Sequence, residues 1–125
     1  MKREVNPEET KTSKLMEYAL VALAQLGETA TKGQIVDRVG EMLKDQLTSA
    51  DRVQVYWGDE GGTAYAPPGY TGETWDVWAG KSKQALVNAR RERLITTNGE
   101  ACELTPEGLK HIAMLAENWL KVKWR

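Results

Sequence analysis

The sequence predicts a mainly α-helical fold with one small β-hairpin, an α+β class built as a single domain. Apolar residues recur every three or four positions in several segments, which is typical of amphipathic helices. An Asn-Gly pair at residues 98–99 lies between two short runs of strand-forming residues, which indicates a hairpin. With 125 residues and no shift in composition, the chain is long enough for one modest hydrophobic core.

The first third of the chain predicts a short arm followed by two helices. Residues 1–12 are highly charged and poor in apolar residues, so we expect a mobile N-terminal arm before a folded domain over residues 13–125. The first apolar stripe stops at Gly27, as expected for a helix with a glycine cap at its C-terminal end. Thr31 and Gln34 have the spacing of a capping box, which predicts the start of the second helix.

Residues 53–78 predict a long loop rich in glycine and aromatic residues, with a short strand near its start. The segment contains five glycines and two adjacent prolines, and it has no helical period. Its aromatic residues could fill the core, bind a protein partner, or stack on an exposed base. The candidate partner-binding residues are Tyr56, Trp57, Tyr65, Tyr70 and Trp75.

A basic helix is predicted over residues 78–93. Ala85, Leu86 and Ala89 form its inner face together with Leu94 at the junction that follows. Residues 80–93 carry five cations and one carboxylate, whereas residues 52–79 carry one cation and four carboxylates. The positive charge is therefore concentrated where a phosphate-binding surface would be expected.

The outer face of this basic helix combines cations with amides. Its outer row consists of Lys81, Gln84, Asn88 and Arg91, with Lys83 and Arg90 on either side. Amides and cations are the groups that base edges and phosphates select, but a solvated helix face has the same composition. The acidic residues of the preceding loop, Asp59, Glu60, Glu73 and Asp76, would repel DNA unless they point away.

The hairpin and the final helix follow directly. Strands are predicted over residues 94–97 and 100–104, joined by a type I′ turn with Asn98 and Gly99 as its central residues. Thr105 then provides a capping hydroxyl and is followed by a proline, which predicts the start of the last helix. Helix, helix, loop, basic helix, hairpin and capped helix is the order of a winged helix-turn-helix fold, in which the hairpin is the wing.

The segments "LMEYALVALAQLGETATKGQIVDRVGEML", "WAGKSKQALVNARRERLI" and "CELTPEGLKHI" also carry a family resemblance. Over residues 14–115 the chain resembles the N-terminal winged-helix domain of Mrr-type restriction proteins. In that family the domain is a DNA-recognition module joined to a separate nuclease domain. We expect no nuclease domain here, because the nearest match to a nuclease motif, Glu9-Thr10-Lys11, follows no strand aspartate. The resemblance therefore implies binding and not cleavage.

Composition argues against several other classes. Cys102 and His111 are the only cysteine and the only histidine, so neither a disulfide nor a thiolate-rich zinc site is expected. We predict no enzyme activity, no metal and no cofactor. No apolar run approaches the roughly 20 residues that span a bilayer, and the N-terminus is charged. A cytoplasmic protein with no membrane partner is therefore expected.

Together these observations predict a small protein that binds double-stranded DNA, either a transcriptional regulator or an accessory DNA-recognition subunit linked to restriction. A homodimer joined through terminal helices would raise its affinity. The alternative is a winged-helix adaptor that docks a larger protein through the aromatic loop at 56–78 and the C-terminal helix. The candidate DNA-binding residues are Lys81, Lys83, Gln84, Asn88, Arg90 and Arg91 of the basic helix, Thr31 and Lys32 at the start of the second helix, and Thr97 and Asn98 at the wing tip, residues 97–99.

Overall fold

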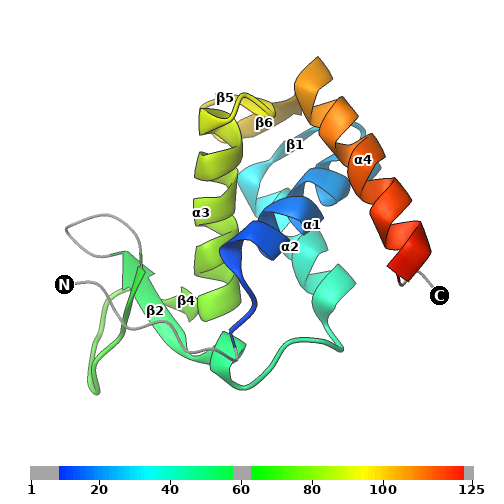
Figure 1. Ribbon diagram of the computed structural model, residues 1–125. Helices are drawn as coiled ribbons and strands as arrows, with labels where there is room; N and C mark the ends of the chain where they lie inside the picture. Colours follow the sequence, from blue (N-terminus) through cyan, green and yellow to red (C-terminus); the bar gives the residue numbers. More distant parts are fainter. Residues whose placement is uncertain (1–8, 58–62, 123–125) are drawn as a thin grey trace.

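The computed structural model describes residues 9–57 and 63–122, and these form four α-helices, one 3-10 turn and two small antiparallel sheets (Figure 1). The helices are α1 (Thr12–Gln25), α2 (Lys32–Leu43), α3 (Val77–Arg91) and α4 (Pro106–Val122), and the 3-10 turn is η1 (Ala50–Arg52). The strands are β1 (Thr29–Thr31), β2 (Gln54–Trp57), β3 (Thr63–Tyr65), β4 (Trp75–Asp76), β5 (Ile95–Asn98) and β6 (Ala101–Leu104). The predicted α+β class is confirmed.

The helix boundaries follow the capping signals of the sequence. At the start of α2, the Gln34 amide donates to Thr31 Oγ1 at 3.1 Å and the Thr31 amide donates to Gln34 Oε1 at 2.9 Å. This reciprocal pair is the predicted capping box. After α1 the chain turns through Gly27 and Glu28, whose φ angles are +96° and +71°. The glycine accepts this left-handed backbone at little cost, and it marks the predicted end of the helix.

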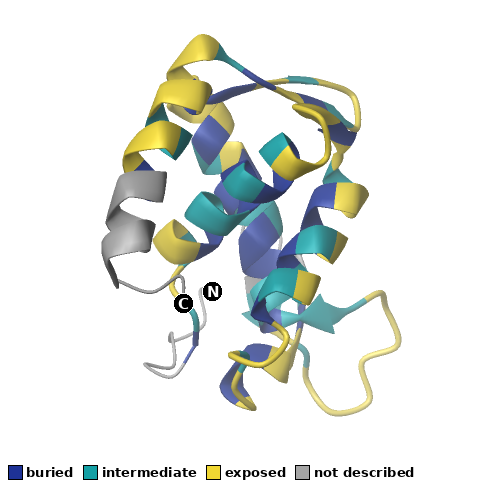
Figure 2. Ribbon diagram, turned by 90° about the vertical axis from the view of Figure 1, so that its right-hand side faces the viewer, coloured by how far each residue is buried: buried dark blue, intermediate teal, exposed yellow. Residues whose placement is uncertain are grey.

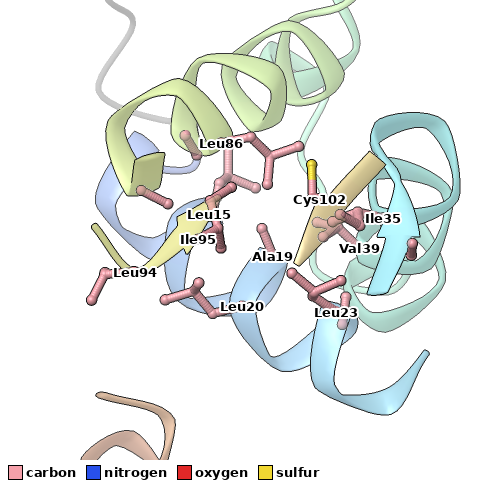
Figure 3. Close-up of a cluster of buried hydrophobic side chains, with 14 of the residues drawn as sticks. Leu15, Ala19, Leu20, Leu23, Ile35, Val39, Leu86, Leu94, Ile95 and Cys102 are labelled. Atoms are coloured by element: carbon pink, nitrogen blue, oxygen red, sulfur yellow. The ribbon is translucent and has the colours of Figure 1, made fainter. Parts of the chain in front are cut away.

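The helices enclose one hydrophobic core with α1 at its centre. In Figure 1, α3 and α4 lie on opposite sides of α1, and α1 contacts each of the other three helices. Leu15, Leu23, Ile35, Leu86 and Cys102, from four different elements, lie among the side chains gathered there (Figure 3). Buried residues occupy the sides of the helices that face one another, and exposed residues occupy the outer sides (Figure 2). This pattern is the amphipathicity read from the sequence.

The first sheet contains the predicted hairpin and one strand that was not predicted. Its strand order is β1-β6-β5, with β1 hydrogen-bonded to β6 through pairs such as Ala30 and Cys102. Asn98 pairs with Ala101, so the two turn residues are Gly99 and Glu100. Only Gly99 of these two has a positive φ, +63°. The predicted type I′ turn at Asn98-Gly99 is therefore wrong by one residue, and a type II′ turn with glycine first takes its place.

The helices on either side of the hairpin, α3 and α4, are linked through the side chain of Thr105. Arg93 adopts a positive φ of +63° after the last turn of α3. The Thr105 hydroxyl donates to the Arg93 carbonyl at 2.7 Å and accepts from the Gly108 amide at 3.0 Å. Thr105 thus caps α4 as predicted, and the same hydroxyl links the start of α4 to the end of α3.

The segment predicted as a long loop forms an ordered insertion between α2 and α3. It contains the second sheet, with strand order β3-β2-β4, and the described residues 53–57 and 63–76 define what we call the insertion. The strand expected near its start is β2. Val55 of β2 is completely buried, and the Val77 amide at the start of α3 donates to the Val53 carbonyl at 2.8 Å. The expectation of an irregular loop was wrong for β2, β3 and β4, whose backbones pair with one another, whereas residues 66–74 form no strand or helix.

The chain before α1 also contributes to the folded unit. The side chain of Glu9 is buried, and Thr10 donates from its amide and its hydroxyl to the two oxygens of Asp51, at 2.7 Å and 2.9 Å. Asp51 lies in η1 and is completely buried. The last residues of the predicted mobile arm are therefore fixed by hydrogen bonds, and residues 1–8 of that arm lie outside the described residues.

Candidate nucleic-acid interface

The outer side of α3 presents one mixed polar and cationic surface. Ala85, Leu86 and Ala89 are at most 3% exposed and hold the inner side of the helix against the core, as predicted. On the opposite side, three residues are exposed and three are half-buried. We call this set the α3 face: Lys83, Gln84, Val87, Asn88, Arg90 and Arg91.

Lys81 does not belong to this face, which corrects its predicted place in the outer row. Lys81 is only 6% exposed, and its Nζ lies 3.3 Å from Glu9 Oε1. The Tyr65 hydroxyl donates to the other oxygen of Glu9 at 2.9 Å. The insertion and the chain before α1 pack around the first turns of α3, so a position that helical spacing places outside becomes interior. Lys81 is therefore a buried ion-pair partner that DNA cannot reach.

Two amides on the α3 face are held together by a hydrogen bond. Gln84 Nε2 donates to Asn88 Oδ1 at 3.1 Å, one turn further along the helix. This bond leaves the Gln84 carbonyl oxygen as an acceptor and the Asn88 amide as a donor. A donor and an acceptor side by side complement the major-groove edge of adenine, which offers N7 as acceptor and N6 as donor.

Lys83 connects the α3 face to the insertion. Its ammonium lies over the ring of Trp75, 4.3 Å from the ring centroid. A cation–π contact of this kind contributes about 0.5–1 kcal/mol at an exposed site and restrains the lysine without neutralising its charge. Trp75, predicted as a partner-binding residue, is thus placed beside the cationic helix.

The acidic residues near α3 differ in their surroundings. Asp76 accepts from Gln54 Nε2 at 2.6 Å and from the Trp78 indole at 3.2 Å, so its carboxylate is held within the insertion. Glu73 is exposed, and Asp59 and Glu60 lie outside the described residues. Asp76, the residue before α3, is therefore turned toward protein donors, which reduces the repulsion that its charge would exert on a phosphate.

The start of α2 and the tip of the β5–β6 hairpin, residues 97–99, are brought together by the first sheet. Thr31 pairs with Ala101, and the Lys32 amide donates to the Glu100 carbonyl at 2.9 Å. The Thr31 hydroxyl is occupied by the capping box, so its predicted phosphate contact would have to compete with that cap. Thr97 is half-buried and Asn98 is exposed.

The tyrosines of the insertion do not share one face, because Tyr65 pairs with the buried Val55 whereas Tyr56 lies on the other face of β2. Tyr56 and Tyr70 stack with their ring centroids 4.7 Å apart and an interplanar angle of 26°. Tyr65 and Tyr70 are 37% and 40% exposed, and Val53 is 44% exposed. The side chain of Trp57 lies outside the described part of the structure.

Within residues 9–57 and 63–122, no group of histidine, cysteine and carboxylate residues has the arrangement of a metal site. Cys102 is fully buried in β6, and this desolvation raises the pKa of its thiol, with a smaller lowering effect from the charge of Lys32 and a smaller raising effect from that of Glu100. A thiol that stays protonated is a poor nucleophile. The described helices also include none with the length and apolar character that crossing a bilayer requires.

Sequence reasoning missed two residues of this region. Glu9 was assigned to a mobile arm, and no local pattern links it to Lys81, which is 72 residues away. Val87 lies on the α3 face, and helical spacing alone places it between Lys83 and Arg91. No protein-family model, curated protein or solved structure matches this chain, so the interpretation of the α3 face rests on its own geometry.

Proposed function

We propose that the protein binds double-stranded DNA and belongs to the winged-helix class. The order α1-β1-α2-α3-β5-β6, with a sheet of order β1-β6-β5, supports this class. In such a fold α3 is the recognition helix and the β5–β6 hairpin is the wing. The resemblance of residues 14–115 to the N-terminal domain of Mrr-type proteins points to the same function. Both a transcriptional regulator and an accessory DNA-recognition subunit would use this surface.

The observation that carries the proposal is the composition of the α3 face. Lys83, Arg90 and Arg91 supply cations for phosphates, and the Gln84–Asn88 pair supplies hydrogen-bonding groups for a base edge. All of them project from one rigid helix whose inner side is fixed in the core. A rigid helix that offers both kinds of group matches the requirements of the major groove.

A homodimer fits the small size of this surface. Three cations on one helix release few counterions, so a single copy would bind weakly and with only a modest salt dependence. Leu109 and Met114 of α4 are 41% and 66% exposed, and they offer apolar area for a second copy. Light scattering of the purified protein measures its oligomeric state directly. A monomer at all protein concentrations would contradict the homodimer.

The DNA-binding proposal predicts a specific effect of charge reversal on α3. Arg90→Glu/Arg91→Glu should abolish binding to random-sequence duplex DNA, measured by fluorescence anisotropy across a salt series. Milder neutralisation, Arg90→Gln/Arg91→Gln, should reduce the slope of log K against log salt by about 2, because each lost phosphate contact removes roughly 0.9. Both positions are exposed, so the variants should stay folded by circular dichroism.

The matched control is Lys14→Glu/Lys44→Glu, which makes the same change in net charge. Lys14 lies in α1 and Lys44 follows α2, and both are exposed. The affinity of this control for duplex DNA should lie within about twofold of that of the native protein, once the weaker long-range attraction that follows from its lower net charge is allowed for. Equal losses in both double variants would show that only net charge matters, and absence of binding by the native protein at low salt would refute the proposal.

The alternative of a protein–protein adaptor is favoured by one observation, the exposed Tyr70 on the insertion, which stacks on Tyr56. Tyrosines are common at the energetic centres of protein interfaces. If the native protein binds no duplex DNA, Tyr70→Ala becomes the variant with which to search for loss of a protein partner.

A further inference from the structure

Val87 is an apolar residue at the centre of a polar and cationic surface. It is 39% exposed, whereas the core contacts of α3 are made by Ala85, Leu86 and Ala89. A β-branched residue is also a poorer helix former than the alanine or lysine that a solvated position would accept. Neither packing in the core nor helix propensity therefore explains why residue 87 is a valine.

The neighbours of Val87 show what it would meet if DNA occupied the α3 face. On a helix surface, residues three and four positions apart are adjacent. Val87 is therefore surrounded by Lys83, Gln84, Arg90 and Arg91. When the cations contact phosphates on both sides of a groove, the residue between them lies over the base edges.

We propose that Val87 contacts the C5-methyl group of a thymine in the major groove, and that the α3 face thereby prefers A·T base pairs. This inference rests on the proposed function. The thymine methyl is the apolar feature of the major-groove edges, and apolar side chains read it by contact. The adjacent Gln84–Asn88 pair offers one acceptor and one donor, which is the complement of adenine. Val87 would thus contact the thymine, and the Gln84–Asn88 pair would bind the adenine of the same base pair.

The methyl group can be removed from DNA without changing its base pairing, which gives a direct test. Duplexes of alternating A and T are compared with duplexes of alternating A and deoxyuridine, which lack only the C5-methyl group. The native protein should bind the thymine duplex about fourfold more tightly, the effect of burying roughly one methyl group. Val87→Ala should bind both duplexes equally, and its salt dependence should match that of the native protein.

A second pair of duplexes separates two sources of the same methyl group. Alternating G and C is compared with alternating G and 5-methylcytosine. A gain with thymine that Val87→Ala removes supports the proposal. A gain confined to 5-methylcytosine overturns the A·T assignment, because adenine is absent from that duplex.

The remaining outcomes separate this inference from the proposed function. Salt-dependent binding by the native protein with equal affinity for thymine and deoxyuridine duplexes overturns the role of Val87 and leaves DNA binding intact. A thymine preference that persists in Val87→Ala assigns the methyl contact to another residue and also overturns the inference. Absence of binding to every duplex at low salt refutes the proposed function itself.

Discussion

At the scale of single residues, the ion pair between Lys81 and Glu9 removes one of the cations of α3 from its accessible surface. Their side chains are 7% and 0% exposed, so both charges are removed from water. A pair of this kind contributes little net stability compared with apolar replacements, but loss of one partner leaves the other charge buried alone. Lys81 is therefore a structural residue, and the proposed α3 face begins after it, at Lys83.

This pairing predicts a large effect of Glu9→Gln. The substitution keeps the shape of the side chain and an acceptor for Tyr65, but it leaves the Lys81 ammonium without a counter-charge. The free energy of unfolding, measured by urea denaturation, should fall by about 3–5 kcal/mol. Glu9→Leu/Lys81→Met, which removes both charges, should recover most of that loss. A Glu9→Gln variant within roughly 0.5 kcal/mol of the native protein would contradict the buried pair.

The burial of Lys81 also shows where helical spacing fails to predict which side chains are exposed. Spacing correctly separated the inner residues of α3 from Gln84, Asn88 and Arg91, because the core contacts of a helix repeat along its own sequence. It failed at Lys81 because the covering groups come from the insertion and from Glu9, which no local pattern identifies. Mutation of Lys81 would destabilise the fold, so it cannot test the proposed interface.

At the scale of elements, α4 is held against the hairpin by a contact that only glycine permits. A Cβ atom at Gly108 would collide with the backbone carbonyl oxygen of Leu94 and would also meet the Leu104 side chain at 3.1 Å. The backbone oxygen cannot move without displacing the end of α3. The first turn of α4 therefore approaches the chain between α3 and β5 as closely as the backbones allow.

Gly108→Ala should therefore destabilise the protein although alanine is the better helix former. We expect a loss of about 2 kcal/mol in the free energy of unfolding, because the strain exceeds the gain of roughly 1 kcal/mol in helix propensity. Gly33→Ala in α2 is the matched control, since its Cβ would meet only Thr31 Oγ1 at 4.0 Å. This control should be as stable as the native protein or more stable. Equal changes in the free energy of unfolding for the two substitutions would show that the close contact at Gly108 does not exclude a larger side chain.

Elements whose signals are local in the sequence could be predicted, and elements defined by distant partners could not. Helices and their caps were predicted well because the signals, such as the capping box at Thr31 and the hydroxyl of Thr105, are local. β1 was missed because a three-residue strand is defined by its partner, and that partner, β6, is distant in the sequence. The insertion was missed for the same reason, because Val55 pairs with both Tyr65 and Trp75 in strands of two and three residues.

At the scale of the whole molecule, the arrangement leaves α3 and α4 with different roles. The two helices lie on opposite sides of α1 (Figure 1). DNA on α3 and a second copy on α4 would therefore not compete for the same surface. The insertion packs beside the first turns of α3, with Trp75 placed against Lys83, and limits the accessible part of α3 to its later turns.

The central claim, that duplex DNA occupies the α3 face, is tested most directly by mapping amide chemical shifts in the ¹⁵N-labelled protein as a short random-sequence duplex is added. The proposal predicts the largest changes between residues 83 and 91, with smaller changes near residues 31–32 and 97–99. Arg90→Glu/Arg91→Glu should remove these changes while the rest of the spectrum stays that of a folded protein. Changes confined to the insertion or to α4, or no change at saturating DNA and low salt, would contradict it.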